Sequence, residues 1–283
     1  MTPAQVYDEE QRARWNGSDG EYWTAQQERL DRTLAPVSDA LVRFAEPLTG
    51  STIIDVGCGC GATTIEFARA AGASGRVIGL DLSEPMLAVA KERLREFPNV
   101  AFLAGDAASM PLRGTDAELM VSRFGVMFFG DPVAAFSNLR SGMAPSGRLR
   151  FACWRSVGEN PWLQVPLHAV YEHAPRLPKP EAEEPGPFAF ADTERVTRIL
   201  TGAGFTKPSF TALDIEVDLG AGGTLEDAVR QSSEMGPAKR ALEGQPEEIR
   251  AAAVEEIRKA LTPFATPKGV RLAGGVWLVA AAN

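Results

Sequence analysis

The sequence predicts an α/β fold: a doubly wound, mostly parallel sheet of seven strands with helices on both faces. Three observations predict it. Short apolar runs alternate with helical stretches between residues 51 and 156, a glycine-rich loop follows the first run, and two more apolar runs come late in the chain. Strands that alternate with helices form parallel sheets with covered faces. The two late strands lack a crossover of the parallel type and should pair antiparallel at one edge.

The expected elements follow from changes in hydrophobic period along the chain. Apolar or alternating runs predict strands at residues 52–56, 77–80, 100–103, 117–122, 149–154, 210–219 and 270–281. Helical spacing and cap residues predict helices at 63–71, from 83 to about 97, from 132, from 161, at 192–203, at 224–235 and at 247–261. Asp131 should cap one of these helices, and Pro145-Ser146-Gly147 should form the turn before strand five.

Composition excludes several classes of protein. The 283 residues are 45% hydrophobic and 23% charged, which is ordinary for a globular chain. The charge of −8 comes from 29 basic and 37 acidic residues, without the basic cluster that nucleic acid binding needs. We find no signal peptide, no apolar run of membrane-spanning length and only three cysteines. We therefore expect a cytoplasmic monomer or homodimer with neither nucleic acid nor a membrane as partner.

A glycine-rich loop joins the first expected strand to the first helix of the sheet. It reads Asp55-Val56-Gly57-Cys58-Gly59-Cys60-Gly61. Glycine permits φ > 0 and the close approach of a ligand, while the N-terminus of the next helix offers free N–H donors and a partial positive charge. Open α/β sheets bind nucleotides at this position. The loop predicts a site for an anionic group, and with Ala62 it also matches a dinucleotide-binding pattern.

Two aspartates follow the next two strands at the same edge of the sheet. Asp81 ends strand two, where its carboxylate can accept hydrogen bonds from both hydroxyls of a ribose, whether of NAD or of S-adenosylmethionine. Asp106 follows strand three, where it can accept a hydrogen bond from an adenine amino group. NAD enzymes do not generally need this second acid. The pair of acids therefore favours S-adenosylmethionine.

With these motifs in place, the chain resembles the class I S-adenosylmethionine-dependent methyltransferases, in particular the small-molecule group related to quinone-biosynthesis methyltransferases. The motifs that carry the resemblance are Ile53 to Gly61, Gly79-Leu80-Asp81-Leu82-Ser83, Gly105-Asp106-Ala107 and Ala203-Gly204-Phe205. It covers roughly residues 15 to 210 and implies a Rossmann-like methyltransferase fold. One departure is Pro145-Ser146-Gly147, where the family often has Pro-Gly-Gly.

The resemblance implies roles for individual residues. Gly57, Gly59 and Gly61 would face the methionine part of S-adenosylmethionine, Asp81 would hold its ribose, and Asp106 would contact its adenine. We expect further cofactor contacts from neighbours of these motifs and from one aromatic residue of the N-terminal helices: Asp55, Leu82, Ala107, Ser122 and Trp23. Trp23, with Trp15 and Tyr22, would stack on adenine or close over the substrate, or else only join those helices together.

The end of strand four lies beside the transferred methyl group in the family. Phe124, Met127 and Phe128 are therefore the candidates for the acceptor pocket, with core packing as the alternative role for two of them. A small organic molecule is the expected acceptor, with oxygen, nitrogen or carbon as its nucleophile. His168, on a helix with Gln164 and Tyr171 on the same side, is the candidate catalytic base for a hydroxyl acceptor.

Four segments organise the chain around these functions. Residues 1–50 are expected to form an N-terminal helical lid, and residues 51–156 the cofactor-binding α/β core. Residues 157–190 form an insert after strand five that should line the acceptor site, since α/β enzymes bind ligands at the carboxyl edge of their strands. The rest, 191–283, should complete the sheet and add helices.

Two other functions stay open on the sequence. An NAD-dependent oxidoreductase would share the loop and Asp81 but would leave Asp106 without a role. A non-catalytic cofactor-binding protein of the same fold is the other alternative, because a fold does not establish a function. A zinc site at Cys58 and Cys60 is not expected, since a closed site needs four ligands and few other candidates exist. We therefore predict no metal.

Overall fold

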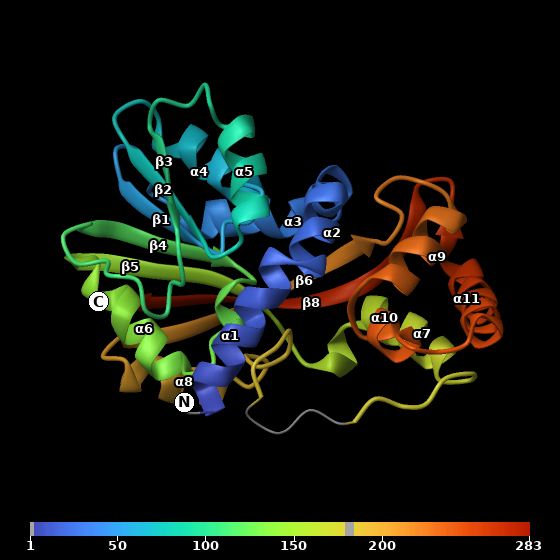
Figure 1. Cartoon of the computed structure of the whole chain (residues 1–283). Coiled ribbons are helices and arrows are strands. Elements are labelled where there is room, and N and C mark those ends of the chain that lie inside the picture. Colours follow the sequence, from blue (N-terminus) through green and yellow to red (C-terminus); the bar gives the residue numbers. More distant parts are fainter. Residues whose placement is uncertain (1–2, 179–183) are drawn as a thin grey trace.

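A sheet of seven main strands forms the centre of the protein (Figure 1). The computed structural model describes residues 3–178 and 184–283. The strands are β1 (Thr52–Val56), β2 (Arg76–Asp81), β3 (Val100–Ala104), β4 (Ala117–Arg123), β5 (Met143–Trp154), β6 (Thr206–Asp218) and β8 (Gly269–Ala282). Their order across the sheet is β3-β2-β1-β4-β5-β8-β6, and the two-residue strand β7 (Ala265–Thr266) pairs with β8.

The strand directions confirm the predicted sheet. The pairs formed among β1 to β5 are all parallel, whereas β8 is antiparallel to both β5 and β6. After β1 the chain moves outward through β2 and β3, then returns to place β4 on the other side of β1. The carboxyl ends of β1 and β4 therefore flank the point where the strand order reverses, which is where open α/β sheets bind ligands.

Helices cover both faces, as the alternation of periods predicts. In Figure 1, α4 (Ala62–Ala71) and α5 (Glu84–Arg93) lie on one side of the sheet, and α6 (Pro132–Ser141) and α8 (Thr193–Gly202) lie on the other. The caps are local: the Asp131 carboxylate accepts a hydrogen bond from the Ala134 N–H at the start of α6, at 3.0 Å.

The N-terminal residues form three helices, of which the third belongs to the core. These are α1 (Pro3–Asn16), α2 (Ser18–Ala25) and α3 (Gln27–Ala45). One face of α3 is buried through Leu30, Val37 and Leu41 and packs against α4, β4 and β5. The predicted lid of residues 1–50 is thereby narrowed to α1 and α2, since α3 is held by the main hydrophobic core.

A second group of helices packs at the other end of the molecule. It contains α7 (Pro161–Val170), α9 (Leu225–Glu234), α10 (Gly236–Leu242) and α11 (Glu247–Leu261), which contact one another (Figure 1). The sequence predicted three of these helices but not the short α10. Within the described part of the chain, no helix is both long and apolar enough to cross a membrane.

Two strands begin well before their predicted starts, β6 at Thr206 instead of residue 210 and β5 at Met143 instead of residue 149. The turn expected at Pro145-Ser146-Gly147 lies inside β5, whose register shifts between the pairs Ala117–Met143 and Leu119–Arg148. The irregular segment is held by Asn283, which donates a backbone hydrogen bond to the Gly147 carbonyl at 3.0 Å and a side-chain bond to the Ala144 carbonyl at 2.7 Å. This pairing with the far end of the chain is a tertiary contact, so the local turn signal could not reveal it.

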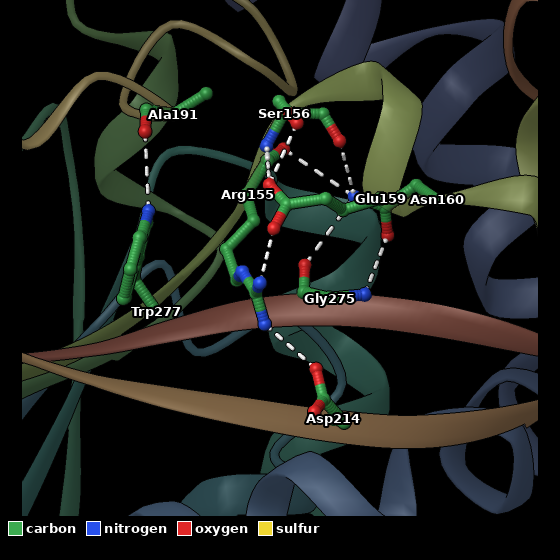
Figure 2. Close-up of polar contacts among 8 residues, drawn as sticks. All are labelled: Arg155, Ser156, Glu159, Asn160, Ala191, Asp214, Gly275 and Trp277. Carbon is green, nitrogen blue, oxygen red and sulfur yellow. Dashed lines mark hydrogen bonds and ion pairs between the residues drawn. The ribbon is translucent and has the colours of Figure 1, made fainter.

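The corner where β5 leads into α7 is closed by one buried amide (Figure 2). Asn160 is fully buried, and its Nδ2 donates to the carbonyls of Arg155, Ser156 and Gly275 at 3.3, 2.9 and 3.3 Å. Its Oδ1 accepts from the Gly275 N–H at 3.1 Å and from Trp162 Nε1 at 3.0 Å. The corner is therefore joined to β8 by a satisfied polar network.

An arginine extends this network to the edge strand of the sheet. The Arg155 guanidinium pairs with Glu159 and, at 2.7 Å, with Asp214 of β6, and it lies 5.2 Å from the ring centre of Trp277 (Figure 2). Trp277 in turn donates from Nε1 to the Ala191 carbonyl at 3.1 Å. The predicted insert at residues 157–190 is thus anchored to the sheet near both of its ends.

We predict that Asn160→Ala lowers the free energy of unfolding by at least about 2 kcal/mol, because it leaves several buried partners without hydrogen bonds. Denaturant unfolding with an unchanged m-value measures this loss. Ser156→Ala, at an exposed cap of the same corner, is the control and should cost less than half as much. Equal losses in the two variants would show that the buried amide has no special weight.

Candidate active site at the carboxyl edge of the sheet

Three glycines between β1 and α4 adopt left-handed backbone conformations. The φ angles are +69° at Gly57, +54° at Gly59 and +82° at Gly61, values that side chains other than glycine rarely adopt. Gly61 is the N-cap of α4, so the loop ends where the helix offers its free N–H groups. The predicted loop and its position before the helix are therefore as expected.

The three glycines differ in what surrounds them. A Cβ at Gly57 would lie 2.9 Å from the backbone Cα of Gly125, so protein packing alone requires this glycine. A Cβ at Gly61 would lie 2.7 Å from the Leu94 Cδ1, so the Leu94 side chain would have to move. A Cβ at Gly59 would have no close contact, since its nearest neighbour is the Met86 Sδ at 3.8 Å. Gly59 is thus the one glycine of the loop whose open side the protein does not fill.

Asp81 ends β2 beside this open position. Its carboxylate accepts hydrogen bonds from the Gly59 N–H at 2.7 Å and from the Ser83 N–H at 2.8 Å. Burial raises the pKa of Asp81 to about 6, even though both hydrogen bonds favour the ionised form. The carboxylate therefore combines two fixed backbone donors with remaining acceptor capacity at the predicted ribose position.

Asp55 lies deeper, within β1. Its Oδ2 accepts hydrogen bonds from the Thr63 and Thr64 hydroxyls, both at 2.7 Å, while its Oδ1 has no partner among the described residues. Burial raises the pKa of this fully enclosed carboxyl. Asp55 thereby joins the first turn of α4 to β1. The two threonines were not singled out from the sequence, although hydroxyl residues at a helix start are a recognisable signal.

The end of β4 supports the glycine loop from the other side. The Ser122 hydroxyl donates to the Val56 carbonyl at 2.7 Å and accepts from the Gly125 N–H at 3.1 Å. Phe124 has a φ of +67°, which is rare for a bulky residue and is typical of functional sites, where the surrounding structure holds it in place. Its ring stacks on Trp154 with centres 4.2 Å apart and planes 10° apart.

The other two acceptor-site candidates follow in a 3₁₀ turn (Val126–Phe128). Met127 is buried in the core, and its carbonyl accepts a hydrogen bond from the Gly186 N–H at 3.0 Å. Phe128 is half-buried, and its ring meets the Trp15 ring edge-on at 5.7 Å. Phe124 and Phe128 therefore keep accessible ring surface, whereas Met127 packs.

Asp106 lies on the next strand connection. β3 pairs with β2 so that Ala104 is level with Asp81, which places Asp106 at the same edge of the sheet. Its Oδ1 accepts from the Ala108 N–H at 2.8 Å, and the buried Ala107 offers its carbonyl to the Asn138 side chain at 2.9 Å. The side chain of Asp106 remains partly exposed.

Helix α1 ends directly over the loop that follows Asp81. The Trp15 carbonyl accepts from the Ser83 hydroxyl at 2.6 Å, and Asn16 both donates to the Leu82 carbonyl at 3.0 Å and accepts from the Glu84 N–H at 2.9 Å. The Trp15 ring also lies 6.2 Å from that of Trp23, in an edge-on contact. Trp15 thus lies between the loop after β2 and the turn after β4, with Trp23 beside it, whereas the Tyr22 ring faces Lys239 of α10.

His168 has surroundings different from those predicted. It is exposed on α7, whose main contacts are with α10, α11 and β8. Among the described residues no hydrogen bond joins its ring to Gln164 or Tyr171, and the Tyr171 ring instead faces the Arg176 guanidinium at 5.6 Å. No hydrogen bond among the described residues therefore orients the His168 imidazole.

The cysteines are buried thiols. Cys58, Cys60 and Cys153 are free, and burial raises the pKa of Cys60 to about 11, so that its thiol stays protonated at neutral pH. Within residues 3–178 and 184–283, no three histidine, cysteine, aspartate or glutamate side chains form a group that could hold a metal ion.

Comparisons with known proteins relate this edge of the sheet to methyl transfer. A family model described as a methyltransferase domain matches residues 53–147. Aklanonic acid methyltransferase DauC from Streptomyces sp. (strain C5) is 29% identical over 182 residues, which are 61% of this chain and 82% of that protein. Demethylmenaquinone methyltransferase from Staphylococcus carnosus is 36% identical, over only 35% of this chain and 41% of its own length.

Solved structures agree on the fold. The YcgJ protein from Bacillus subtilis superimposes with a TM-score of 0.56 at 14% identity, covering 87% of this chain and 97% of that one. A phosphoethanolamine N-methyltransferase from Haemonchus contortus, solved with S-adenosylhomocysteine, gives 0.53 at 16% identity, covering 88% of this chain and 52% of that one. The [4+2]-cyclase SpnF gives 0.50 at 19% identity, over 87% of this chain and 80% of that one.

We predict different costs for the same substitution at two glycines. Gly57→Ala and Gly59→Ala both place alanine at positive φ, which costs about 1–2 kcal/mol, but only Gly57→Ala also forces two backbone segments apart. The loss in free energy of unfolding should therefore be larger by at least about 1 kcal/mol for Gly57→Ala. Denaturant titration of the two variants measures the difference. Equal stabilities would contradict the packing difference between the two positions.

Proposed function

We propose that this chain, a class I S-adenosylmethionine-dependent methyltransferase, transfers the methyl group to an oxygen, nitrogen or carbon nucleophile of a small organic molecule. One observation carries the proposal. The open side of Gly59, the buried carboxylate of Asp81 and the partly exposed Asp106 lie along one edge, at the point where the strand order reverses. The methyltransferase relatives support the same reading.

Each part of this edge suits one part of the cofactor. Gly59 and the N-terminus of α4 would receive the methionine end, because no side chain fills that side of the loop. Asp81 would accept hydrogen bonds from the ribose hydroxyls, and Asp106 from the adenine amino group. Further contacts to the cofactor would come from Leu82, Ala107, Ser122 and Trp23. Asp55 would hold the start of α4 in position through its hydrogen bonds to that helix.

The proposed mechanism relies on positioning. S-adenosylmethionine supplies an electrophilic methyl group when bound. The residues of this chain align the acceptor with that group and exclude water, and such alignment can provide much of the rate. Trp15, Trp23 and Phe128 would close the site as parts of a lid formed by α1 and α2, since their rings meet edge-on. Phe124, held in its rare backbone conformation, would present its ring to the acceptor.

A proton acceptor is needed only for some acceptors. An amine requires a neutral lone pair, whereas an unactivated hydroxyl requires a base. His168, which is exposed on α7, is our proposal for that base. The insert at residues 157–190 would contribute the other acceptor contacts, because it begins at the carboxyl end of β5.

The fold alone does not establish methyl transfer, since a cyclase shares it. A comparison of the affinities for S-adenosylmethionine and NAD also tests the alternative of NAD-dependent oxidation. We predict that the protein binds S-adenosylmethionine and S-adenosylhomocysteine but binds NAD at least ~tenfold more weakly. Asp81→Asn should weaken binding of S-adenosylmethionine at least ~tenfold, because it removes a charge-assisted hydrogen bond of about 1.5–3 kcal/mol. Titration calorimetry measures both effects.

The matched control is Asp116→Asn, at an exposed position before the opposite end of β4. It should leave the affinity for S-adenosylmethionine unchanged. Tighter binding of NAD than of S-adenosylmethionine by the unaltered protein would falsify the assignment.

The raised pKa of Asp81 also predicts a pH dependence. Burial favours its protonated form in the folded protein, so the contribution of Asp81 to stability falls as pH rises from about 4 to about 6. Ribose binding has the opposite dependence, because the hydroxyls donate to the ionised carboxylate. With a pKa of about 6, affinity at pH 5 should be about tenfold weaker than at pH 7.5. Calorimetry across this range should give a flat profile for Asp81→Asn; a flat profile for the unaltered protein would contradict the mechanism.

A further inference from the structure

Arg123 is the last residue of β4 and lies beside the candidate site. It follows Ser122 and precedes Phe124, the residue with positive φ. Its Nη1 donates a hydrogen bond to the Ser38 hydroxyl of α3 at 2.7 Å. The side chain is therefore directed toward α3, which packs on the same side of the sheet as α4 and the glycine loop.

No carboxylate of the described residues forms an ion pair with Arg123. The two acids that attract it are Asp31 and Asp55. Asp31 is already paired with Arg93 at 2.7 Å, and the Asp55 Oδ2 is taken by two hydroxyls of α4. The Ser38 hydroxyl is a neutral partner. The guanidinium thus has one short hydrogen bond and keeps other donors without a partner among these residues.

The guanidinium is deep in the protein but not sealed off. Desolvation by the surrounding protein lowers the pKa of Arg123 below its ordinary value. The residue nevertheless keeps partial exposure, and none of its nitrogens is both fully enclosed and without a hydrogen-bond partner. Arg123 therefore keeps limited contact with solvent. A cation in such a place is costly unless an anion completes its surroundings.

Arg123 lies on the glycine-loop side of the proposed cofactor site. Cys60 of the glycine loop lies within electrostatic reach of Arg123. The carbonyl of Cys60 accepts a hydrogen bond from Arg93, which holds the loop against α5 and α3. The N-terminus of α4 begins two residues later and adds partial positive charge. An anionic group at this point would meet both a guanidinium and a helix N-terminus.

We propose that Arg123 binds the carboxylate of the methionyl part of S-adenosylmethionine, and that Ser38 is a positioning residue that directs the guanidinium toward it. The inference rests on the proposed function and deepens it by assigning a residue to the anionic end of the cofactor. Arg123 has the geometry for this task, because a planar guanidinium binds a carboxylate through two parallel hydrogen bonds.

The test compares two ligands that differ only in the carboxylate. Titration calorimetry measures the affinity of the full chain for S-adenosylmethionine and for decarboxylated S-adenosylmethionine. The unaltered protein should prefer the first at least ~tenfold, as a charge-assisted hydrogen bond implies. Arg123→Met should reduce this preference to less than ~threefold, mainly by weakening S-adenosylmethionine. Asp81→Asn should weaken both ligands by the same factor and so preserve the preference.

Two further variants separate binding from support. Arg123→Lys keeps the charge but loses the planar fork, so its preference should lie between those of the unaltered protein and Arg123→Met. Ser38→Ala should lower the preference by a smaller factor, because it removes only the hydrogen bond that directs the guanidinium. Equal weakening of both ligands in Arg123→Met, or an unaltered protein that binds the two ligands equally, overturns the proposal. An unaltered protein that binds neither ligand would instead reject the proposed function. If Arg123→Met does not fold, the unaltered protein and Arg123→Lys still decide.

Discussion

The candidate site depends on the close contact between two stretches of backbone, at Gly57 after β1 and Gly125 after β4. A Cβ added at either glycine would lie about 3 Å from the Cα of the other glycine. This close contact lies at the carboxyl edge of the sheet, where the strand order reverses. Ser122 fastens the same two segments by hydrogen bonds to the Val56 carbonyl and from the Gly125 N–H. These contacts join the two loops that contain Gly59 and Phe124.

Much of this arrangement could be predicted from the sequence, because it depends on local signals. The strands and most helices follow from hydrophobic period and caps, and the order of Gly59, Asp81 and Asp106 along the chain places them at one edge of any parallel sheet. Pairings between distant residues could not be read in this way. The bulge in β5 depends on Asn283, and the contact of Arg123 with Ser38 joins residues 85 positions apart. Neither has a local pattern that marks it.

Hydrogen bonds join helix α1 to the loop that follows Asp81, and they couple the two segments. Ser83 donates its backbone N–H to Asp81 and its hydroxyl to the Trp15 carbonyl, so one residue contacts both the site and α1. Asn16 adds two bonds to the neighbouring backbone. Movement of α1 away from the sheet would break three hydrogen bonds within the segment that orients Asp81. Opening of the proposed lid and loss of the proposed ribose site would therefore accompany each other.

The position of β8 affects how the sheet can be assembled. It comes last in chain order among the described strands, yet it lies between β5 and β6. It pairs with β6 along most of its length and with β5 from Val276 to Ala282. Until β8 is present, the outer edge of β5 and the inner edge of β6 expose unpaired N–H and C=O groups, which other chains can bind. The five parallel strands can form early, but β6 cannot join them. Because β6 pairs only with β8 among the described strands, we expect it to join the sheet together with β8 or after it, through pairings of high contact order that form slowly compared with helices.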